Sequence, residues 1–231
     1  MDRLALRLAV HGAEFYPRIL SLTEITLLRD IGDRVVGTNP GARIYDSAIL
    51  NEMLSRNGGA GKIARDLLGP SARPVRAIMF DKSPNMNWAL GWHQDRTIAV
   101  RGRVETDGFG PWTIKSGCVH VEPPFSVTRQ MITLRVHLDD VDDKNAPLLI
   151  APGSHDIGRI AASDIPETVA KLGYLECLAE AGDIWVYVTS ILHASDKAMN
   201  SRRRRVLQVD FSAMDLPGGL EWSGIDGFDL T

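Results

Sequence analysis

A change of residue pattern near Pro74 constrains the fold of this 231-residue chain more than any other feature. Beyond it, short runs rich in β-branched and aromatic residues alternate with Gly and Pro, as strands alternate with turns. The strongest runs are residues 75–80, 131–136, 184–188 and 206–211. Many short strands after a helical segment predict an α+β, mainly β fold with a sandwich or barrel core.

Residues 1–72, ahead of this change, are predicted to be mostly helical. Ser21 and Glu24 have the spacing of a capping box, and apolar residues follow at helical intervals until Gly37. Further helices are expected at about residues 47–56, 61–68 and 163–172. We expect one domain over residues 1–231, with its strand-rich core in residues 73–231.

Composition excludes several classes of partner. The net charge of −3 gives no electrostatic basis for binding nucleic acid or an anionic membrane. No apolar run approaches the roughly 18 residues of a membrane span, and no secretory signal is recognised at the N-terminus. Cys118 and Cys177 are expected to be free thiols. These features favour a cytoplasmic protein that acts on a small molecule; they do not indicate an oligomeric state.

Three triplets of the form His-x-acid compete for the role of a paired metal site, and they begin at His93, His120 and His137. On a strand, residues i and i+2 point to the same side, so such a triplet can supply two adjacent ligands. The His93 triplet is favoured because it lies in an apolar, aromatic stretch. The His137 triplet runs into an acidic turn, and the His120 triplet precedes two prolines that break strand pairing.

A third ligand is expected from a distant strand, because an oxygen-activating iron(II) site needs three protein ligands on one octahedral face. His193 follows the predicted strand 184–188, and Arg204 opens the last strand eleven residues later. The planar fork of an arginine suits a carboxylate, so Arg204 is a candidate for holding a dicarboxylate co-substrate. The alternative for the arginine run 202–205 is a solvated basic turn or nucleic-acid patch, which the acidic balance of the chain disfavours.

Several motifs occur in a fixed order between residues 75 and 222. They are WHQD (92–95), LDD with NAPL (138–140, 145–148), APGSH (151–155), GD (182–183), HAS (193–195) and RRVL (204–207). In this order they resemble the phytanoyl-CoA dioxygenase family. Ala146 stands where that family usually has Gly, and the Asn and Ser usual after the second His are displaced to Asn200 and Ser201.

The resemblance implies a double-stranded β-helix, or jelly roll, with the N-terminal helices packed on one sheet. It also implies an iron(II) enzyme that uses 2-oxoglutarate and O2. The metal would be held by His93, Asp95 and His193. The co-substrate would be bound by Arg204, assisted by Ser195, with further contacts from Gln94, Thr97 and Lys82.

The expected reaction is hydroxylation of a C–H bond in a small metabolite, natural-product intermediate or acyl derivative. The carboxylate at Asp95 favours hydroxylation, because halogenases of this class lack it. Alternatives are desaturation, epimerisation or ring rearrangement with the same cofactors, or a non-catalytic jelly-roll protein that binds a metal or ligand. The candidate substrate residues are Trp92, Trp112, Lys115 and His120. For the two tryptophans, the alternative is that they pack in the core.

Overall fold

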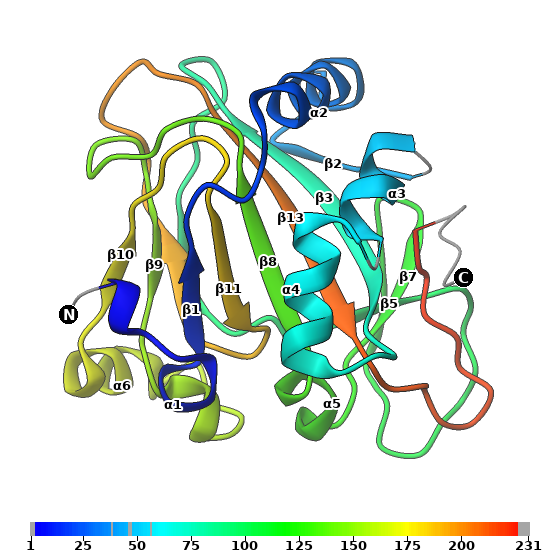
Figure 1. The fold of residues 1–231 in the computed structure, drawn as a ribbon. Helices are drawn as coiled ribbons and strands as arrows, with labels where there is room; N and C mark the ends of the chain where they lie inside the picture. The colour runs from blue at the N-terminus through cyan, green and yellow to red at the C-terminus, as the bar shows by residue number, and fades with distance from the viewer. Residues whose placement is uncertain (1–2, 38, 46–47, 56, 226–231) are drawn as a thin grey trace.

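The computed structural model describes residues 3–37, 39–45, 48–55 and 57–225 (Figure 1). Its helices are η1 (Arg3–Ala5), α1 (Leu8–His11), α2 (Leu22–Val35), α3 (Ala48–Leu54), α4 (Gly59–Leu68), α5 (Phe125–Arg129), η2 (Ser154–Asp156) and α6 (Ile165–Leu172). Its strands are β1 (Ala13–Tyr16), β2 (Gly41–Arg43), β3 (Arg73–Lys82), β4 (Leu90–His93), β5 (Ile98–Val100), β6 (Trp112–Lys115), β7 (Cys118–Val121), β8 (Ile132–His137), β9 (Leu148–Ile150), β10 (Leu175–Cys177), β11 (Ile184–Val188), β12 (His193–Ser195) and β13 (Arg204–Ser212).

Helices α2, α3, α4 and α6 form where the sequence pattern predicts them, whereas α1, α5 and the two 3-10 helices were not predicted. At the start of α2, the Ser21 hydroxyl accepts from the Glu24 backbone N–H at 3.2 Å, and the Glu24 carboxylate accepts from the Ser21 backbone N–H at 2.8 Å. This capping box confirms the predicted start of the helix. Helix α3 lies inside the predicted range 47–56, whose end residues Ser47 and Arg56 fall outside the described residues. Within the described ranges, no helix is long and apolar enough to cross a bilayer.

Two antiparallel sheets face each other. The larger has the strand order β1-β11-β8-β13-β3-β2, and the smaller has the order β10-β9-β12-β4. The four strongest predicted strands are confirmed as β3, β8, β11 and β13, which are neighbours in the large sheet. Strands distant in sequence lie side by side, as the jelly-roll prediction required. The N-terminal part also contributes β1 and β2, two short strands that the sequence did not reveal.

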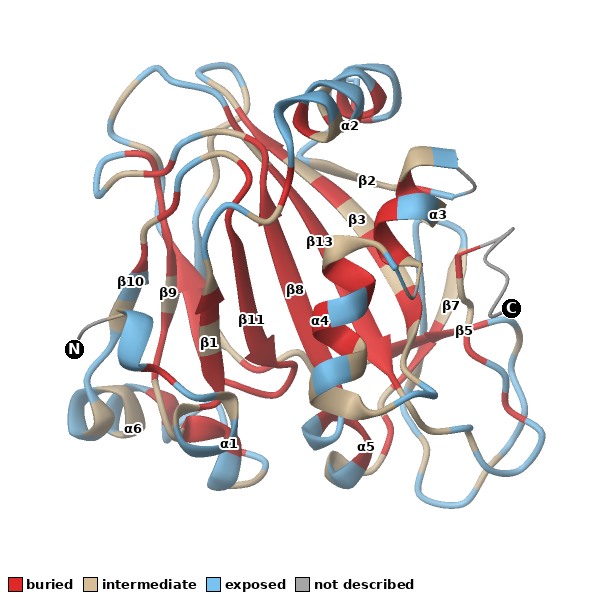
Figure 2. Ribbon diagram, viewed as in Figure 1, coloured by how far each residue is buried: buried red, intermediate tan, exposed pale blue. Residues whose placement is uncertain are grey.

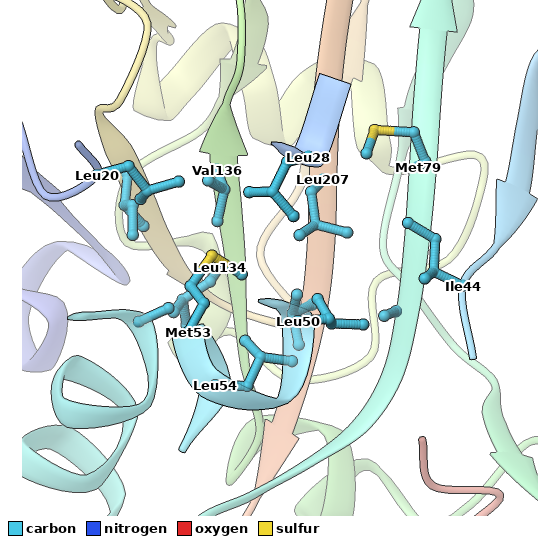
Figure 3. Packing of buried hydrophobic residues seen from close by; sticks show 14 of the residues in the cluster. Leu20, Leu28, Ile44, Leu50, Met53, Leu54, Met79, Leu134, Val136 and Leu207 are labelled. Carbon is cyan, nitrogen blue, oxygen red and sulfur yellow. The ribbon is translucent and has the colours of Figure 1, made fainter. Parts of the chain in front are cut away.

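Helices α2, α3 and α4 cover the outer face of the large sheet (Figures 1 and 2). Leu134 and Val136 of β8 and Leu207 of β13 point to this side and are fully buried. They pack in one cluster with Leu28 of α2 and Leu50 of α3 (Figure 3). The expected packing of N-terminal helices on one sheet is therefore confirmed, and this layer is an apolar core.

The inner face of the same sheet is polar where the strands β3, β13 and β8 meet. Because side chains alternate along a strand, the residues between the apolar ones point to the four-stranded sheet. Lys82 of β3 pairs with Arg204 of β13. Two steps along the inner face, beyond Val206, Gln208 of β13 pairs with Ile78 on one side and with Arg135 on the other. Towards β11 and β1 the space between the sheets is filled by an apolar cluster: Leu6, Ala13, Phe15, Leu148, Ile150, Cys177, Ala179, Trp185, Tyr187 and Ile191.

A third sheet, in the order β5-β7-β6, follows the segment after β4. One side of it packs in an apolar cluster with Val75 and Trp222. Its other side carries His120, whose cross-strand partners are Ala99 and Thr113. The Arg43 guanidinium of β2 lies 2.7 Å from His120, so this side faces the open edge of the large sheet.

Candidate metal centre

Three predicted ligands come together between the sheets. His93 ends β4 and His193 begins β12, and the two residues are direct partners across these strands. Their ring centroids lie 4.2 Å apart. The ligand atoms of His93, Asp95 and His193 all lie within 4.8 Å of one another, and no other group of three or more such residues occurs in the described part of the chain.

The hydrogen bonds of the two imidazoles leave one nitrogen of each ring for a metal. Nδ1 of His93 lies 2.7 Å from the Gly91 carbonyl, and Nδ1 of His193 lies 3.0 Å from the Ile191 carbonyl. A carbonyl only accepts, so Nδ1 carries the proton and Nε2 keeps its lone pair. Burial lowers the pKa of His193 to about 4, with Asp95 opposing and His93 adding to the effect. Both rings thus have the tautomer that metal-binding histidines adopt.

Asp95 supplies the carboxylate of the group. Burial would raise its pKa, but the nearby charges of His193, Arg76 and His93 outweigh burial and lower it. Its Oδ2 lies 3.7 Å from Nη2 of Arg76, and Nε of Arg76 in turn donates to Asp210 at 2.5 Å. Two imidazoles and one carboxylate on one side of a site are the donor set typical of non-haem iron(II) oxygenases.

A cavity of about 120 Å³ adjoins the three ligands. Its walls come from the inner face of the large sheet and from β4 and β12. The residues that line it are Arg76, Ile78, Phe80, Lys82, Trp88, Leu90, His93, Asp95, Arg135, Leu148, His193, Ala194, Ser195, Arg204 and Gln208. The cavity therefore joins the ligand group to the polar region of the inner face.

Positive charge gathers at the end of the cavity away from Asp95. Lys82, Arg135 and Arg204 are 1%, 6% and 2% exposed. Arg204 donates from Nη1 to the Ala146 carbonyl at 2.6 Å, and Lys82 donates to the Ser195 hydroxyl at 2.9 Å. None of the ion pairs among the described residues includes any of the three cations.

The pKa values of Arg204 and Lys82 are lowered, which is consistent with the lack of nearby negative charge. Burial lowers the pKa of Arg204 to about 9, and the charge of Arg135 adds to this effect. Burial together with Arg204 and Arg135 lowers the pKa of Lys82 to about 7, against a small opposing effect of Asp196. Nε of Arg204 and Nε of Arg135 are buried without a hydrogen-bond partner. Because unpaired buried cations are costly, this end of the cavity fits a carboxylate ligand.

Two predicted co-substrate residues lie outside the cavity lining. The Gln94 amide donates to the carbonyls of Gly158 and Ser190 at 3.0 and 2.8 Å, and its oxygen accepts from the Ile160 backbone N–H at 3.0 Å. The hydrogen-bonding capacity of this side chain is therefore directed to the loops that pass behind the metal ligands. The Thr97 hydroxyl accepts from Nζ of Lys115 at 3.0 Å.

The candidate substrate residues separate into two groups. Trp92 lies beside Tyr174, with ring centroids 6.0 Å apart, and lines a groove with α6 rather than the metal cavity. Trp112 packs against the apolar cluster under the third sheet. His120 and Lys115 lie on the polar side of that sheet, and the charge of Lys115 contributes to the lowered pKa of Asp95. Only these last two approach the metal ligands.

The rival triplets serve other contacts. Asp139 accepts from Arg205 at 2.8 Å and forms an ion pair with Arg29 at 3.0 Å. Glu122 forms an ion pair with Arg159 at 2.9 Å. His137 is fully buried on the inner face, whereas Asp140, Asp143 and Lys144 in the turn that follows are exposed, as the acidic sequence suggested.

Sequence reasoning did not identify Arg76, Arg135, Gln208 and Asp210 as parts of the site. All four lie inside apolar strands. A charged or amide residue in the middle of a strand predicted to be buried could have indicated a functional role for each of them. The three strands that carry them were predicted, so alternation from Arg204 would have placed Gln208 and Asp210 on the cavity side.

Comparisons with known proteins identify the family of the chain. The family model described as phytanoyl-CoA dioxygenase matches residues 61–206. A search of curated proteins gave no significant match.

Solved structures share the fold at low identity. The epimerase SnoN from nogalamycin biosynthesis is 17% identical with a TM-score of 0.66, covering 94% of this chain and 89% of that one. EctD from S. alaskensis is 15% identical with a TM-score of 0.66, covering 94% and 78%. HygX from Streptomyces hygroscopicus, solved with nickel, 2-oxoglutarate and hygromycin B, is 14% identical with a TM-score of 0.61, covering 89% and 84%.

Proposed function

Because the chain belongs to the phytanoyl-CoA dioxygenase family, we propose that His93, Asp95 and His193 hold its iron(II) ion. Members of this family are iron(II)- and 2-oxoglutarate-dependent oxygenases, and this protein is an enzyme of that class. The proposal extends to Arg204, Ser195 and Lys82 as the residues that hold the distal carboxylate of 2-oxoglutarate. With iron(II), 2-oxoglutarate and O2 bound, the site supplies an oxidant for a C–H bond as 2-oxoglutarate becomes succinate and carbon dioxide.

The observation that carries the metal assignment is the convergence of two free Nε2 atoms and one ionised carboxylate beside a cationic cavity. The protein's own contribution is orientation. Backbone carbonyls fix each imidazole, and Arg76 holds Asp95 in its charged form. Gln94 is assigned a positioning role, because its amide ties the segment after β4 to neighbouring loops. For Thr97, whose hydroxyl binds Lys115, we likewise propose a positioning role.

We infer that the substrate is a small organic molecule bound above the metal ligands. Ile78, Phe80, Trp88 and Leu90 give the cavity an apolar wall, which suits the hydrocarbon part of such a molecule. HygX was solved with hygromycin B, and SnoN with nogalamycin RO, which supports a natural product or its intermediate as the substrate.

The polar contacts of this substrate are proposed to come from Lys115 and His120. Both lie on the side of the third sheet that faces Arg43 and the metal ligands. Hydroxylation is the proposed outcome. Epimerisation is the principal alternative, because the same donor set serves both reactions, and the mass of the product separates them.

Anaerobic addition of iron(II) and 2-oxoglutarate tests the metal assignment. A weak visible charge-transfer absorption should develop, and His93→Ala and His193→Ala should abolish it. His11→Ala is the matched control, because His11 lies in α1 and hydrogen-bonds the Arg7 backbone N–H. An undiminished absorption in either ligand variant would contradict the assignment. Succinate release against a metabolite library then identifies the substrate, and His120→Gln should weaken its apparent affinity.

A further inference from the structure

Arg135 occupies a place on the inner face that the metal and distal-carboxylate assignments do not use. It faces Gln208 across β8 and β13, one inner-face step from the pair of Asp210 with Thr133. Asp210 holds Arg76 beside Asp95, whereas Arg204 lies further along β13 in the opposite direction. Arg135 thus stands between the metal ligands and the distal-carboxylate residues.

The contacts of Arg135 do not neutralise its charge. Its Nη1 donates to the Gln208 side-chain oxygen at 3.1 Å, and its guanidinium carbon lies 5.8 Å from the Phe80 ring centroid. Its Nε is buried without a partner. An amide and an aromatic ring provide weaker compensation than a carboxylate for a charge that is 6% exposed.

Two partly buried arginines of the same sheet are paired with acids. Arg76 lies 2.5 Å from Asp210, and Arg205 lies 2.8 Å from Asp139. The contrast is sharpest on β13, where Arg205 faces outward to a carboxylate while Arg204 faces inward to a carbonyl. Lys82, Arg135 and Arg204 are the fully buried cations among the described residues; all three line the cavity and none forms an ion pair, so scaffolding alone does not explain them.

The three unpaired cations of the cavity exceed the charge of one carboxylate. Lys82 and Arg204 are cross-strand partners at its far end, so they can share a single carboxylate. Arg135 also lines the cavity, and its Nε is buried without a hydrogen-bond partner. A dicarboxylate offers a second negative group and so complements the whole arrangement.

We propose that Arg135 is a second carboxylate-binding arginine, and that Arg135 and Arg204 form a dicarboxylate site that is complete without the metal. This inference rests on the proposed function for the identity of the ligand. The group near the metal ligands is held by Arg135, and the distal group is held by Arg204 with Lys82. The site consequently binds 2-oxoglutarate in the absence of iron and also binds the product succinate.

Metal-free protein, stripped with a chelator, tests the proposal by calorimetric titration. Succinate and butyrate are the probes, because they share a four-carbon chain and differ by one carboxylate. Succinate should bind the metal-free protein at least about tenfold more tightly than butyrate, since a charge-assisted hydrogen bond is worth about a tenfold to hundredfold change in affinity. Undetectable succinate binding, or equal affinities for the two probes, would overturn the proposal.

Two variants assign the effect to Arg135. Arg135→Met should weaken succinate binding about 10- to 100-fold and leave butyrate binding unchanged, because butyrate uses only the distal end. Arg205→Met is the matched control: it removes a guanidinium on the outer face and should leave both affinities unchanged. If Arg135→Met leaves succinate affinity unchanged, or weakens both probes equally, the assignment is wrong.

Thermal unfolding separates ligand binding from a scaffolding role. Removing an uncompensated buried charge should raise the Tm of ligand-free Arg135→Met, whereas Arg205→Met should lower the Tm by breaking its pair with Asp139. A lower Tm in Arg135→Met would count against the proposal. These measurements contain no iron, so they can succeed or fail independently of iron-dependent turnover, which tests the proposed function.

Discussion

The two faces of the large sheet are made by the same strands and have opposite chemistry. Along β8, Leu134 and Val136 point outward to the helices, while Arg135 between them points inward to the cavity. The outer face buries apolar side chains in a continuous cluster, which is the main favourable contribution to folding. The inner face buries three cations that form no ion pair (Lys82, Arg135 and Arg204), which opposes folding and favours a ligand. The same strands therefore provide stability on one side and binding on the other.

The largest effect is expected on the inner face, from His193→Ala. Turnover should fall by more than about 100-fold, because the loss of a group that merely orients a metal ligand already costs about 10- to 100-fold. The Tm of the metal-free variant should stay close to that of the wild type. Steady-state succinate release measures turnover, and a thermal melt measures the Tm. Retained turnover would contradict the functional role that we assign to the inner face.

The opposite result is expected on the outer face, from Leu134→Ala. This fully buried residue packs against α3 and α4, so the unfolding free energy should fall by about 2–5 kcal/mol. Urea denaturation measures the loss. Nickel and 2-oxoglutarate affinities of the folded variant should match those of the wild type. A large drop in affinity with little loss of stability would show that the faces do not divide their roles as described.

The pH dependence of co-substrate binding sharpens the inner-face argument. Burial, Arg204 and Arg135 lower the pKa of Lys82 to about 7, and an added carboxylate raises it again. At pH 8 the amine is mostly neutral in the free protein, so binding should take up a proton. Affinity should then weaken as pH rises above 7, by at most about tenfold per unit. Calorimetry of nickel-loaded protein in buffers of different ionisation enthalpy measures the uptake, which Lys82→Met should remove.

The smallest effect is expected at the helix that covers the outer face, from Ser21→Ala. Loss of the hydroxyl that caps α2 should lower the unfolding free energy by about 1 kcal/mol, or the Tm by about 2–4 °C. Thr26→Ala on the exposed side of the same helix is the control and should stay within about 0.5 kcal/mol. A change in co-substrate affinity in Ser21→Ala would link two faces that we describe as separate.

Strong local patterns made the major elements predictable. The runs that became β3, β8, β11 and β13 are long and rich in β-branched residues, and the Ser21–Glu24 pair marked a helix start. Strands β1 and β2 were missed because they are short and weakly patterned. Each forms as an edge strand of the large sheet, on β11 and on β3, which is a tertiary effect that local sequence does not encode.

The site could be predicted only in part. The metal ligands and Arg204 carry recognisable motifs, and the structure brings them to one cavity. The roles of residues next to the ligands were harder to predict. Trp92 and Gln94 flank His93, and because side chains alternate along a strand, they point away from the metal cavity. Arg135 belongs to no recognised motif. Its role can be inferred only from the pairing of β8 with β13, which places it opposite Gln208.

The direct pairing of β4 with β12 also has a consequence for biosynthesis. His93 is translated well before His193, and Arg204 of β13 leaves the ribosome later still. A nascent chain that has exposed only His93 and Asp95 lacks the partner strand that completes the proposed donor set. We therefore expect metal uptake to follow the synthesis of β12, so that a product terminated before His193 would have no capacity to hold a reactive ion.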